Sequence, residues 1–498
     1  MTYNQKLEAF LENSNNAVIN AFQRIDLRIL LFILLCLNFL SFIPTSNEEA
    51  YLPLAKQFMD PGWMPNSFIF NEWAGNRLFF QYLTGFFLKY IEFEPFVFFA
   101  RMLTFLLISI PLAAVLKTLQ IKNLYLVVII QIYLLHQNYF GREFIFGDFE
   151  AKSLAYIFVL AGVYFLLHNK FIVAVIFSVL ASYFHILVGG WFFVLIFLYS
   201  MVKERSIILL LKEGVIFIVL LVPFGLYLGK EIGHAGTVIN GVNIDWVYVF
   251  FRNPHHLAPL SVKEMLPEII TEVSITGLLF IFTLVYLRKF SGELINKLYY
   301  LNVIVFTLLF LFLGVSLIDK NGFFLKFYLF RFAAIGCFLM YLYVLSLLKL
   351  IPKVSPLIKS SFILIGFYII IAEGIETYKD IFVPEQKKAY SELIKYVTQF
   401  TDPKDIFLSL DDYELSFSRR TRREEFVSYK LVPGGGEKIY EWYNRILQRR
   451  IIADDISKLE YLKQKYRINY IISNHALENS EKLVLVFKNS AFSLYKAE

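Results

Sequence analysis

Two groups of acidic residues lie at the edges of long apolar segments, where carboxylates could do chemistry beside a membrane. Glu48 and Glu49 follow the first apolar segment, and Asp148 and Glu150 precede a later one. Carboxylate oxygens can coordinate a divalent cation or accept a proton from a hydroxyl. The alternative is structural, because acidic residues suit helix N-termini and Asp148 could be an N-cap. Lys152 is not expected to pair with Glu150, because helix residues two apart do not face each other, so one of them is expected to point into a cavity.

Adjacent histidines form the most specific local pattern in the chain. The segment VFFRNPHHLAPLS contains Arg252, Pro254, His255 and His256. Two imidazoles held beside a proline can donate and accept protons or bind a borderline metal ion. The alternative is a loop that is polar because it is hydrated. His185, alone among apolar residues in SYFHILVGGW, is interpreted as a hydrogen-bonded structural group.

Several basic residues are candidates for binding an anion such as phosphate. Arg331 interrupts the apolar segment FYLFRFAAIG, where an unpaired cation is costly, and its guanidinium could bind phosphate bidentately. The alternative is an arginine that reaches the membrane surface from a helix end. A second group lies in FSRRTRREEFVSYKLVP, where Glu424 and Glu425 make an ordinary solvated β-hairpin the alternative. The candidates are Arg142, Arg252, Arg331, Arg422 and Lys430.

The elements that carry these residues are predicted to be membrane helices. Hydrophobic residues make up 57% of the chain and charged residues only 18%, which is typical of a polytopic membrane protein. A further run, residues 76–91, is interpreted as an amphipathic helix in the membrane interface. Cys36 and Cys337 lie in apolar runs, so we expect neither a disulfide nor a thiolate metal site. Eleven runs are long enough to span the bilayer, at residues 27–43, 95–116, 123–138, 151–167, 171–184, 186–202, 206–228, 269–287, 298–318, 324–349 and 358–375.

The distribution of basic residues predicts the orientation. Lys and Arg in short loops favour the cytoplasmic side, and an interfacial 76–91 helix puts all the basic loops there. These loops contain Lys117, Lys122, Lys170, Lys203, Arg205, Arg288, Lys289, Lys349 and Lys353. The N-terminus is then cytoplasmic, whereas the acidic residues, the histidine pair and the C-terminus lie outside. No small-residue cleavage site follows the first span, which is expected to remain as an anchor.

The composition changes after residue 376, which predicts a transmembrane domain at residues 1–376 and a small extracytoplasmic α/β domain at 377–498. The expected strands are 405–410, 469–472, 483–487 and 491–495, and the expected helices are 385–400, 437–450 and 456–466. No P-loop, Rossmann glycine pattern, GxSxG or CxxC motif occurs, so soluble nucleotide chemistry finds no support. The net charge of +7 mainly reflects the cytoplasmic loops and does not indicate nucleic-acid binding.

This layout resembles the GT-C class of polyprenyl-phosphate-dependent glycosyltransferases, which includes protein mannosyltransferases, oligosaccharyltransferases and the lipid A aminoarabinose transferase. Within that class, the chain is similar to bacterial multi-pass membrane proteins that carry an Arg-x-Pro-His-His loop, here RNPHH at 252–256. Their outer domain has an Arg-rich strand, then Lys-x-x-Pro and Glu-Trp-Tyr-x-Arg. The corresponding segments here are RRTRREEFVSYKLVP at 419–433 and EWYNR at 441–445.

The resemblance implies a GT-C-like fold in the bacterial inner membrane and transfer of a sugar from a polyprenyl-phosphate donor to an extracytoplasmic lipid, glycan or protein. Glu48 or Glu49 would match the first-loop acid that activates the acceptor or binds a metal, and Asp148 or Glu150 the second acidic site. A divalent cation on these four carboxylates is the one cofactor that the resemblance leaves open. The class usually has an Asp at the first site, whereas this chain has Glu48–Glu49.

In the enzyme interpretation, Arg331 and either His255 or His256 stabilise charge on the departing phosphate. The first alternative is a transporter or flippase of a lipid-linked intermediate. Such proteins usually show internal repeats and ionisable groups near the bilayer midplane, whereas this chain shows no evident repeat and its charged groups gather at span ends, except Arg331. The second alternative is a non-catalytic membrane scaffold, which predicts that Glu48, Glu49 and His256 tolerate alanine.

Overall fold

The computed structural model describes residues 3–65, 67–72, 74–232, 238–286, 292–348, 354–381, 385–411, 416–477 and 483–497. The chain divides into two compact units, each built from several segments. The first contains Met1–Leu40, Phe98–Tyr227 and Asn253–Tyr378, and the second contains Ser41–Val97, Leu228–Arg252 and Lys379–Glu498. The second unit therefore combines two loops of the predicted membrane domain with the C-terminal residues.

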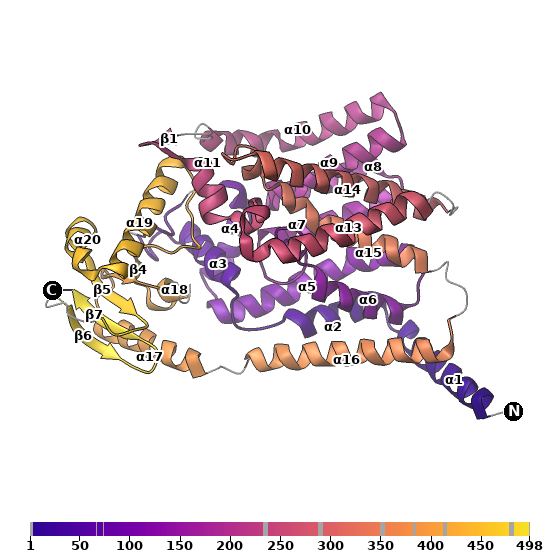
Figure 1. The fold of residues 1–498 in the computed structure, drawn as a ribbon, viewed down its shortest axis with the longest axis horizontal. Helices are drawn as coiled ribbons and strands as arrows, with labels where there is room; N and C mark the ends of the chain where they lie inside the picture. The colour runs from indigo at the N-terminus through magenta and orange to yellow at the C-terminus, as the bar shows by residue number, and fades with distance from the viewer. Residues whose placement is uncertain are drawn as a thin grey trace. The chain divides into compact units, whose positions relative to one another are not determined.

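Apolar helices build the first unit (Figure 1), although the ends of three of them, residues 93–97, 228–232 and 379–381, belong to the second. They are α1 Tyr3–Arg24, α2 Leu27–Phe39, α5 Phe93–Thr118, α6 Asn123–His136, α7 Ala151–Leu167, α8 Phe171–Phe184, α9 Ile186–Lys203, α10 Ile207–Ile232, α13 Leu266–Tyr286, α14 Glu293–Ile318, α15 Ala333–Leu348 and α16 Pro356–Ile381. Short turns complete it, namely α12 Pro254–Leu257, η3 Pro259–Ser261, η4 Lys263–Met265, η6 Leu325–Phe327 and η7 Leu329–Phe332.

Seven of the helical segments in the described part of the chain are long and apolar enough to cross a membrane. Four predicted spans, those at α2, α6, α7 and α8, form apolar helices of 10 to 17 residues, so the total of eleven spans stays a prediction. In α10, α13 and α16 most of the apolar surface is exposed, whereas the segment Leu325–Leu347 is mostly buried. This contrast is expected when some helices face lipid and others form the interior. Arg288, Lys289, Lys349 and Lys353, used to predict the orientation, lie outside the described residues.

The second unit contains a five-stranded sheet with strand order β4-β3-β5-β7-β6. Its strands are β3 Ile406–Ser409, β4 Glu424–Glu425, β5 Ile468–Ser473, β6 Leu483–Lys488 and β7 Ser493–Ala497. β3 runs parallel to β4 and β5, whereas β7 runs antiparallel to β5 and β6. The helices of this region are α17 Glu385–Phe400, α18 Phe417–Thr421, α19 Gly436–Asp454, η8 Ile456–Lys458 and α20 Leu459–Tyr466. The predicted α/β character of the C-terminal residues is confirmed.

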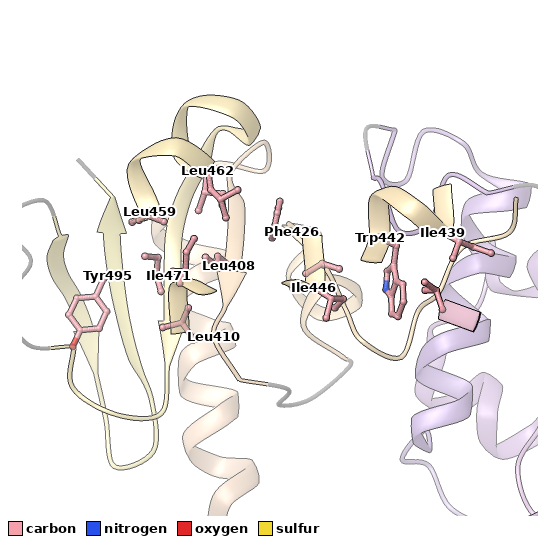
Figure 2. Close-up of a cluster of buried hydrophobic side chains, with 14 of the residues drawn as sticks. Leu408, Leu410, Phe426, Ile439, Trp442, Ile446, Leu459, Leu462, Ile471 and Tyr495 are labelled. Carbon is pink, nitrogen blue, oxygen red and sulfur yellow. The ribbon is translucent and has the colours of Figure 1, made fainter. Parts of the chain in front are cut away.

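The sheet buries side chains on both faces because successive strand residues point in opposite directions. Leu408 and Ile471 belong to one cluster of buried side chains, drawn in Figure 2, that also includes Trp442 of α19 and Leu462 of α20. Phe407, next to Leu408, belongs instead to a second cluster with residues of α17 and α18. Helices therefore cover both faces of the sheet.

The Arg-rich segment differs from the predicted strand. Arg419 and Arg420 lie on the short helix α18, and only Glu424 and Glu425 pair with β3. Arg422 ends the helix in the left-handed conformation with φ of 54°, which redirects the chain into β4. Because β4 is parallel to its only partner β3 within the described residues, the β-hairpin alternative was wrong.

The first loop of the second unit forms α3 Ser46–Met59, η1 Gly75–Arg77 and α4 Leu78–Leu88. With 11 residues, α4 is ~16 Å long and too short to cross roughly 30 Å of hydrocarbon. One face is buried against α3, where a side chain at Gly85 would clash with the carbonyl oxygen of Ala55. The other face exposes Phe79, Tyr82, Leu83, Phe86 and Phe87. These features support the prediction of an interfacial helix. The segment Leu228–Arg252 of this unit forms β1 Val238–Ile239, β2 Val242–Asn243, α11 Ile244–Trp246 and the π-helix η2 Val247–Arg252.

Candidate functional site

A tight loop at residues 137–146 positions the polar residues of the first unit. The side chain of Gln137 closes the loop, because its amide donates to the Phe146 carbonyl and its oxygen accepts from the amides of Ile145 and Phe146. Between Gln137 and these residues, Phe140, Gly141 and Arg142 have positive φ values of 32°, 68° and 56°. For residues other than glycine, the left-handed conformation has a free-energy cost, and such residues are often found at functional sites.

Glu143 follows this turn and forms a buried ion pair with Arg331 of η7. The Nη1 atom of Arg331 donates to Oε2 of Glu143 at 2.6 Å, and the side chains are only 12% and 1% exposed. The Nε atom of Arg331 and the Oε1 atom of Glu143 are buried without hydrogen-bond partners among the described residues. A buried guanidinium with an unused N–H is suited to bind an anion, because leaving that donor unpaired has a free-energy cost.

His256 of α12 joins this cluster. Its Nδ1 atom lies 2.6 Å from the Gly141 carbonyl oxygen and 3.7 Å from Oε1 of Glu143. Its ring lies 4.1 Å from that of His255, measured between centroids. Glu143, Arg331 and His256 therefore form one cluster of acid, cation and imidazole, to which we refer as the Glu143 cluster.

Glu150 and Lys152 pair with each other, contrary to expectation. Their charged atoms are 3.0 Å apart and both side chains are buried. The helix-spacing argument failed because Glu150 is the N-cap of α7, with extended backbone, and is not within the helix. Asp148 is therefore not the N-cap, and its carbonyl accepts a hydrogen bond from the hydroxyl of Ser153.

Two further polar contacts surround the same loop. Arg142, at an exposed position, lies 3.4 Å from Glu268 of α13. Glu272, one turn further along α13, accepts a hydrogen bond from the amide of Phe140. His185 has a structural role as expected, because it caps α9 by accepting from the amide of Val188.

In the second unit, Glu49 is held by Arg419. The Nε and Nη2 atoms of Arg419 donate to the two oxygens of Glu49, both at 2.7 Å, and Nη1 donates to Glu94 at 2.8 Å. The side chains of Arg419 and Glu49 are 6% and 9% exposed. Burial alone would lower the pKa of Arg419, but its hydrogen bonds and charge interactions with Glu49, and then with Glu94, raise it above the ordinary value. This ion pair joins α3 to α18.

Glu48 and Lys430 also act at the start of α3. Glu48 and Thr45 form a capping box, in which each side chain accepts from the backbone amide of the other. The ammonium of Lys430 donates to Ser46 and Asn47, both at 2.8 Å. The carbonyl oxygen of Lys430 in turn accepts from Nη2 of Arg252 at 2.7 Å.

Arg252 is a second buried arginine with unused hydrogen-bonding capacity. It is 9% exposed, and its guanidinium lies 5.2 Å from the ring centroid of Tyr429. Its Nε atom has no hydrogen-bond partner within the described ranges. Arg422, by contrast, is exposed. Arg252 and Arg331 are therefore the two candidate phosphate-binding residues that combine burial with a free N–H.

Glu424 ties the sheet to the first loop and was not recognised from the sequence. Its Oε1 atom accepts from the amide of Phe68 at 2.8 Å, and its Oε2 atom is buried without a partner in the described part of the chain. Burial raises the pKa of Glu424 to about 7, although hydrogen bonds from Ser67 and Phe68 and the charge of Arg445 act in the opposite direction.

We expect the second unit to lose stability as the pH rises from 4.5 to about 7, because Glu424 ionises at the lower value when unfolded and at the higher value when folded. The loss is at most about 3 kcal/mol. Glu424→Gln removes the titration and keeps an acceptor for the amide of Phe68. The apparent melting temperature of the variant in detergent should therefore rise relative to the wild type as the pH increases. A difference that stays constant with pH would contradict the assignment.

The sequence-predicted residues thus fall into two groups. Asp148, Glu150, Arg142, His255, His256 and Arg331 belong to the first unit, and Glu48, Glu49, Arg252, Arg422 and Lys430 belong to the second. The partners Glu143, Glu94 and Arg419 were not predicted from the sequence, although other charged residues lie near them in the chain. No group of three or more His, Cys, Asp or Glu side chains that could hold a metal ion occurs among the described residues.

Comparisons with known proteins give three results. A family described as Domain of unknown function (DUF6798) matches residues 388–448, which include Arg419, Glu424 and Lys430. No curated protein sequence matches. The chain is similar to ArnT from Cupriavidus metallidurans bound to undecaprenyl phosphate, with a TM-score of 0.47, 10% identity and coverage of 96% of this chain and 97% of ArnT. For ArnT in the apo state the TM-score is 0.42, the identity 12% and the coverage 94% and 96%.

Proposed function

We propose that the chain is a membrane glycosyltransferase that moves a sugar from a polyprenyl-phosphate donor to an extracytoplasmic acceptor. The observation that carries the proposal is the Glu143 cluster, in which a buried guanidinium with an unused N–H lies beside a proton-accepting imidazole and a carboxylate. Such a transfer needs a cation for the phosphate that leaves and a base for the hydroxyl that attacks. No nucleotide is needed, because the sugar arrives activated on lipid.

Arg331 is the group we assign to the donor phosphate. Its ion pair with Glu143 offsets the cost of burying the guanidinium, and the remaining N–H can donate to a phosphate oxygen. In the second unit, Arg252, Arg422 and Lys430 are the groups we assign to an anionic part of the donor or the acceptor. This assignment rests on the unused Nε of Arg252 and the exposure of Arg422.

Three of the four candidate carboxylates already have partners that a divalent cation would displace. Both oxygens of Glu49 accept from Arg419, Glu150 is paired with Lys152, and Glu48 caps α3. Each would have to give up a charged or capping partner to bind a cation, so we derive no step through a metal ion. Glu49 remains the first-loop acid that the family resemblance implies, and Arg419 holds it in place.

The function is tested with purified protein in liposomes that contain a radiolabelled polyprenyl-phosphate sugar, supplied with a bacterial envelope extract as acceptor source. We expect label to leave the lipid and appear in product only with the protein present. A flippase would instead leave the donor chemically intact and change only the leaflet from which it can be extracted or oxidised. Leaflet exchange without any product, over a panel of donor sugars, would contradict the proposal.

A further inference from the structure

We propose that His256 is the general base for the acceptor hydroxyl and that Glu143 is the residue that positions it. This inference rests on the proposed glycosyltransferase function and names the proton acceptor within it. The resemblance to the GT-C class implies that an acidic residue of the first loop is the general base. The contacts in this chain instead favour the imidazole of His256.

The hydrogen bond to Gly141 fixes the tautomer of His256. A carbonyl oxygen only accepts hydrogen bonds, so Nδ1, at 2.6 Å from it, must carry the hydrogen. The lone pair of the neutral ring is then on Nε2, which is the atom that can take a proton. The side chain of His256 is 30% exposed, so the ring is within reach of a substrate.

The positive-φ turn at residues 140–142 is what brings the carbonyl of Gly141 to the ring. Gly141 has φ of 68°, and an added Cβ would lie 3.0 Å from the carbonyl oxygen of His256. The two segments therefore approach each other closely, with little room for a side chain. The hydrogen bond to the ring is consequently built into the backbone and does not depend on a flexible partner.

Glu143 is suited to stabilise the protonated ring. One oxygen, Oε2, is bonded to Arg331, whereas Oε1 lies 3.7 Å from Nδ1 and is buried without a hydrogen-bond partner among the described residues. A carboxylate at this distance favours the imidazolium. Glu143 and His255 lie against His256, and Arg331 is bonded to the other oxygen of Glu143. With His256 protonated, the Glu143 cluster carries one net positive charge, which we assign to the departing phosphate.

The carboxylates of the first loop are weaker candidates for the base. Both oxygens of Glu49 accept from a guanidinium, and an adjacent cation favours the ionised carboxylate over the protonated acid. Glu48 uses Oε2 to accept from the amide of Thr45. A proton taken by either group would weaken an existing contact. A protonated His256 is instead attracted to the carboxylate of Glu143.

The step conserves atoms and charge. The acceptor oxygen forms a bond to the anomeric carbon of the sugar as its proton moves to Nε2 of His256. The bond between the anomeric carbon and the phosphate oxygen breaks, and its electron pair stays with polyprenyl phosphate. The imidazolium then releases the proton to solvent.

The tautomer can be tested without any activity assay. Solid-state NMR of protein labelled with ¹⁵N-histidine in lipid distinguishes Nδ1–H from Nε2–H in neutral rings, and the His256 signal is identified by its loss in His256→Asn. We expect the Nδ1–H form. A neutral His256 ring with its hydrogen on Nε2 would overturn the inference even if the protein transfers sugar.

The role of His256 as the base is tested by two substitutions, each of which keeps a polar atom near one of the two ring nitrogens. Asn places an amide near Nδ1 and can still donate to Gly141, so His256→Asn should fold normally but lose about 10²–10⁴-fold in transfer rate. His256→Gln lacks that donor and should lose both activity and melting temperature. His168→Asn is the matched control, because His168 also bonds a carbonyl through Nδ1, at an exposed helix end.

Glu143→Gln tests the positioning role, and its melting temperature is measured alongside its activity because the buried Arg331 loses its counterion. We expect it to move the rising limb of the pH–rate profile to lower pH and to reduce the rate, whereas His256→Asn should abolish that limb. A rate for His256→Asn within about threefold of the wild type would overturn the inference while leaving the proposed function intact. If neither the wild type nor any variant transfers sugar while the Nδ1–H form is still observed, the proposed function is overturned, and with it the role of His256 as the base.

Discussion

Arg419→Ala is expected to destabilise the second unit by about 3–5 kcal/mol, because it leaves the buried carboxylate of Glu49 without its counterion. Glu94 loses the same partner but is half exposed, so water can replace part of that interaction. The expected readout is a lower apparent melting temperature, together with faster hydrogen exchange in α3 and α18.

The neighbouring arginine provides the control for this prediction. Arg420 lies on the same helix but is exposed, where it bonds the hydroxyl of Ser391 at 3.2 Å and stacks near Tyr390, so Arg420→Ala should cost less than about 1 kcal/mol. Combining Arg419→Met with Glu49→Gln should recover part of the loss, because only the half-exposed carboxylate of Glu94 then remains without its partner. Equal stability of the Arg419→Ala and Arg420→Ala proteins would show that the ion pair does not hold α3 to α18.

Arg331→Lys is expected to fold and to lose about 10²-fold or more in sugar transfer. A lysine keeps a positive charge for Glu143 but cannot pair with Glu143 and present a second, fixed N–H to phosphate as a guanidinium does. Arg331→Met should in addition be unstable, since it leaves Glu143 buried without a counterion. The measurements are the transfer rate in liposomes and the melting temperature of each variant.

A basic residue near the same turn provides the control. Lys326 lies on η6 and contacts the rings of Phe323 and Phe327, so Lys326→Met should transfer at the wild-type rate. Should Arg331→Lys retain full activity, the donor phosphate would have to be bound elsewhere, and Arg252 with its unused Nε would be the next candidate.

The sequence predicted the local elements well because their signals are local. Apolar runs located the membrane helices, and alternation with turn residues located β3, β5, β6 and β7 within a few residues. The two-residue strand β4 was not predicted, because its pairing depends on β3 and not on its own composition.

The partners of the site residues could not be predicted, because they come from distant parts of the chain. Arg419 is 370 residues from Glu49, Arg331 is 188 from Glu143, and His256 is 115 from Gly141. No rule based on the spacing of residues in the sequence predicts contacts between such distant residues. Glu150 and Lys152 show the opposite error, since a helix rule was applied to a residue that caps the helix from outside.

Contacts within the second unit join the C-terminal residues to the first loop. Arg419, Glu424 and Lys430 bind Glu49, Phe68 and Ser46, respectively. The family match at residues 388–448 includes all three of these C-terminal partners. We therefore expect that deletion of the C-terminal residues would also expose the polar groups of α3, and that the two parts fold as one unit.

The membrane orientation decides whether the Glu143 cluster and the second unit can serve one extracytoplasmic reaction. It is measured most directly with single cysteines and a membrane-impermeant maleimide on intact spheroplasts. Cysteine would be placed at exposed Arg142 and Arg422 and at Lys117, and the background from Cys36 and Cys337 subtracted. We predict that Arg142→Cys and Arg422→Cys label from outside and that Lys117→Cys labels only after lysis. Labelling of Arg422→Cys only after lysis would contradict an extracytoplasmic site.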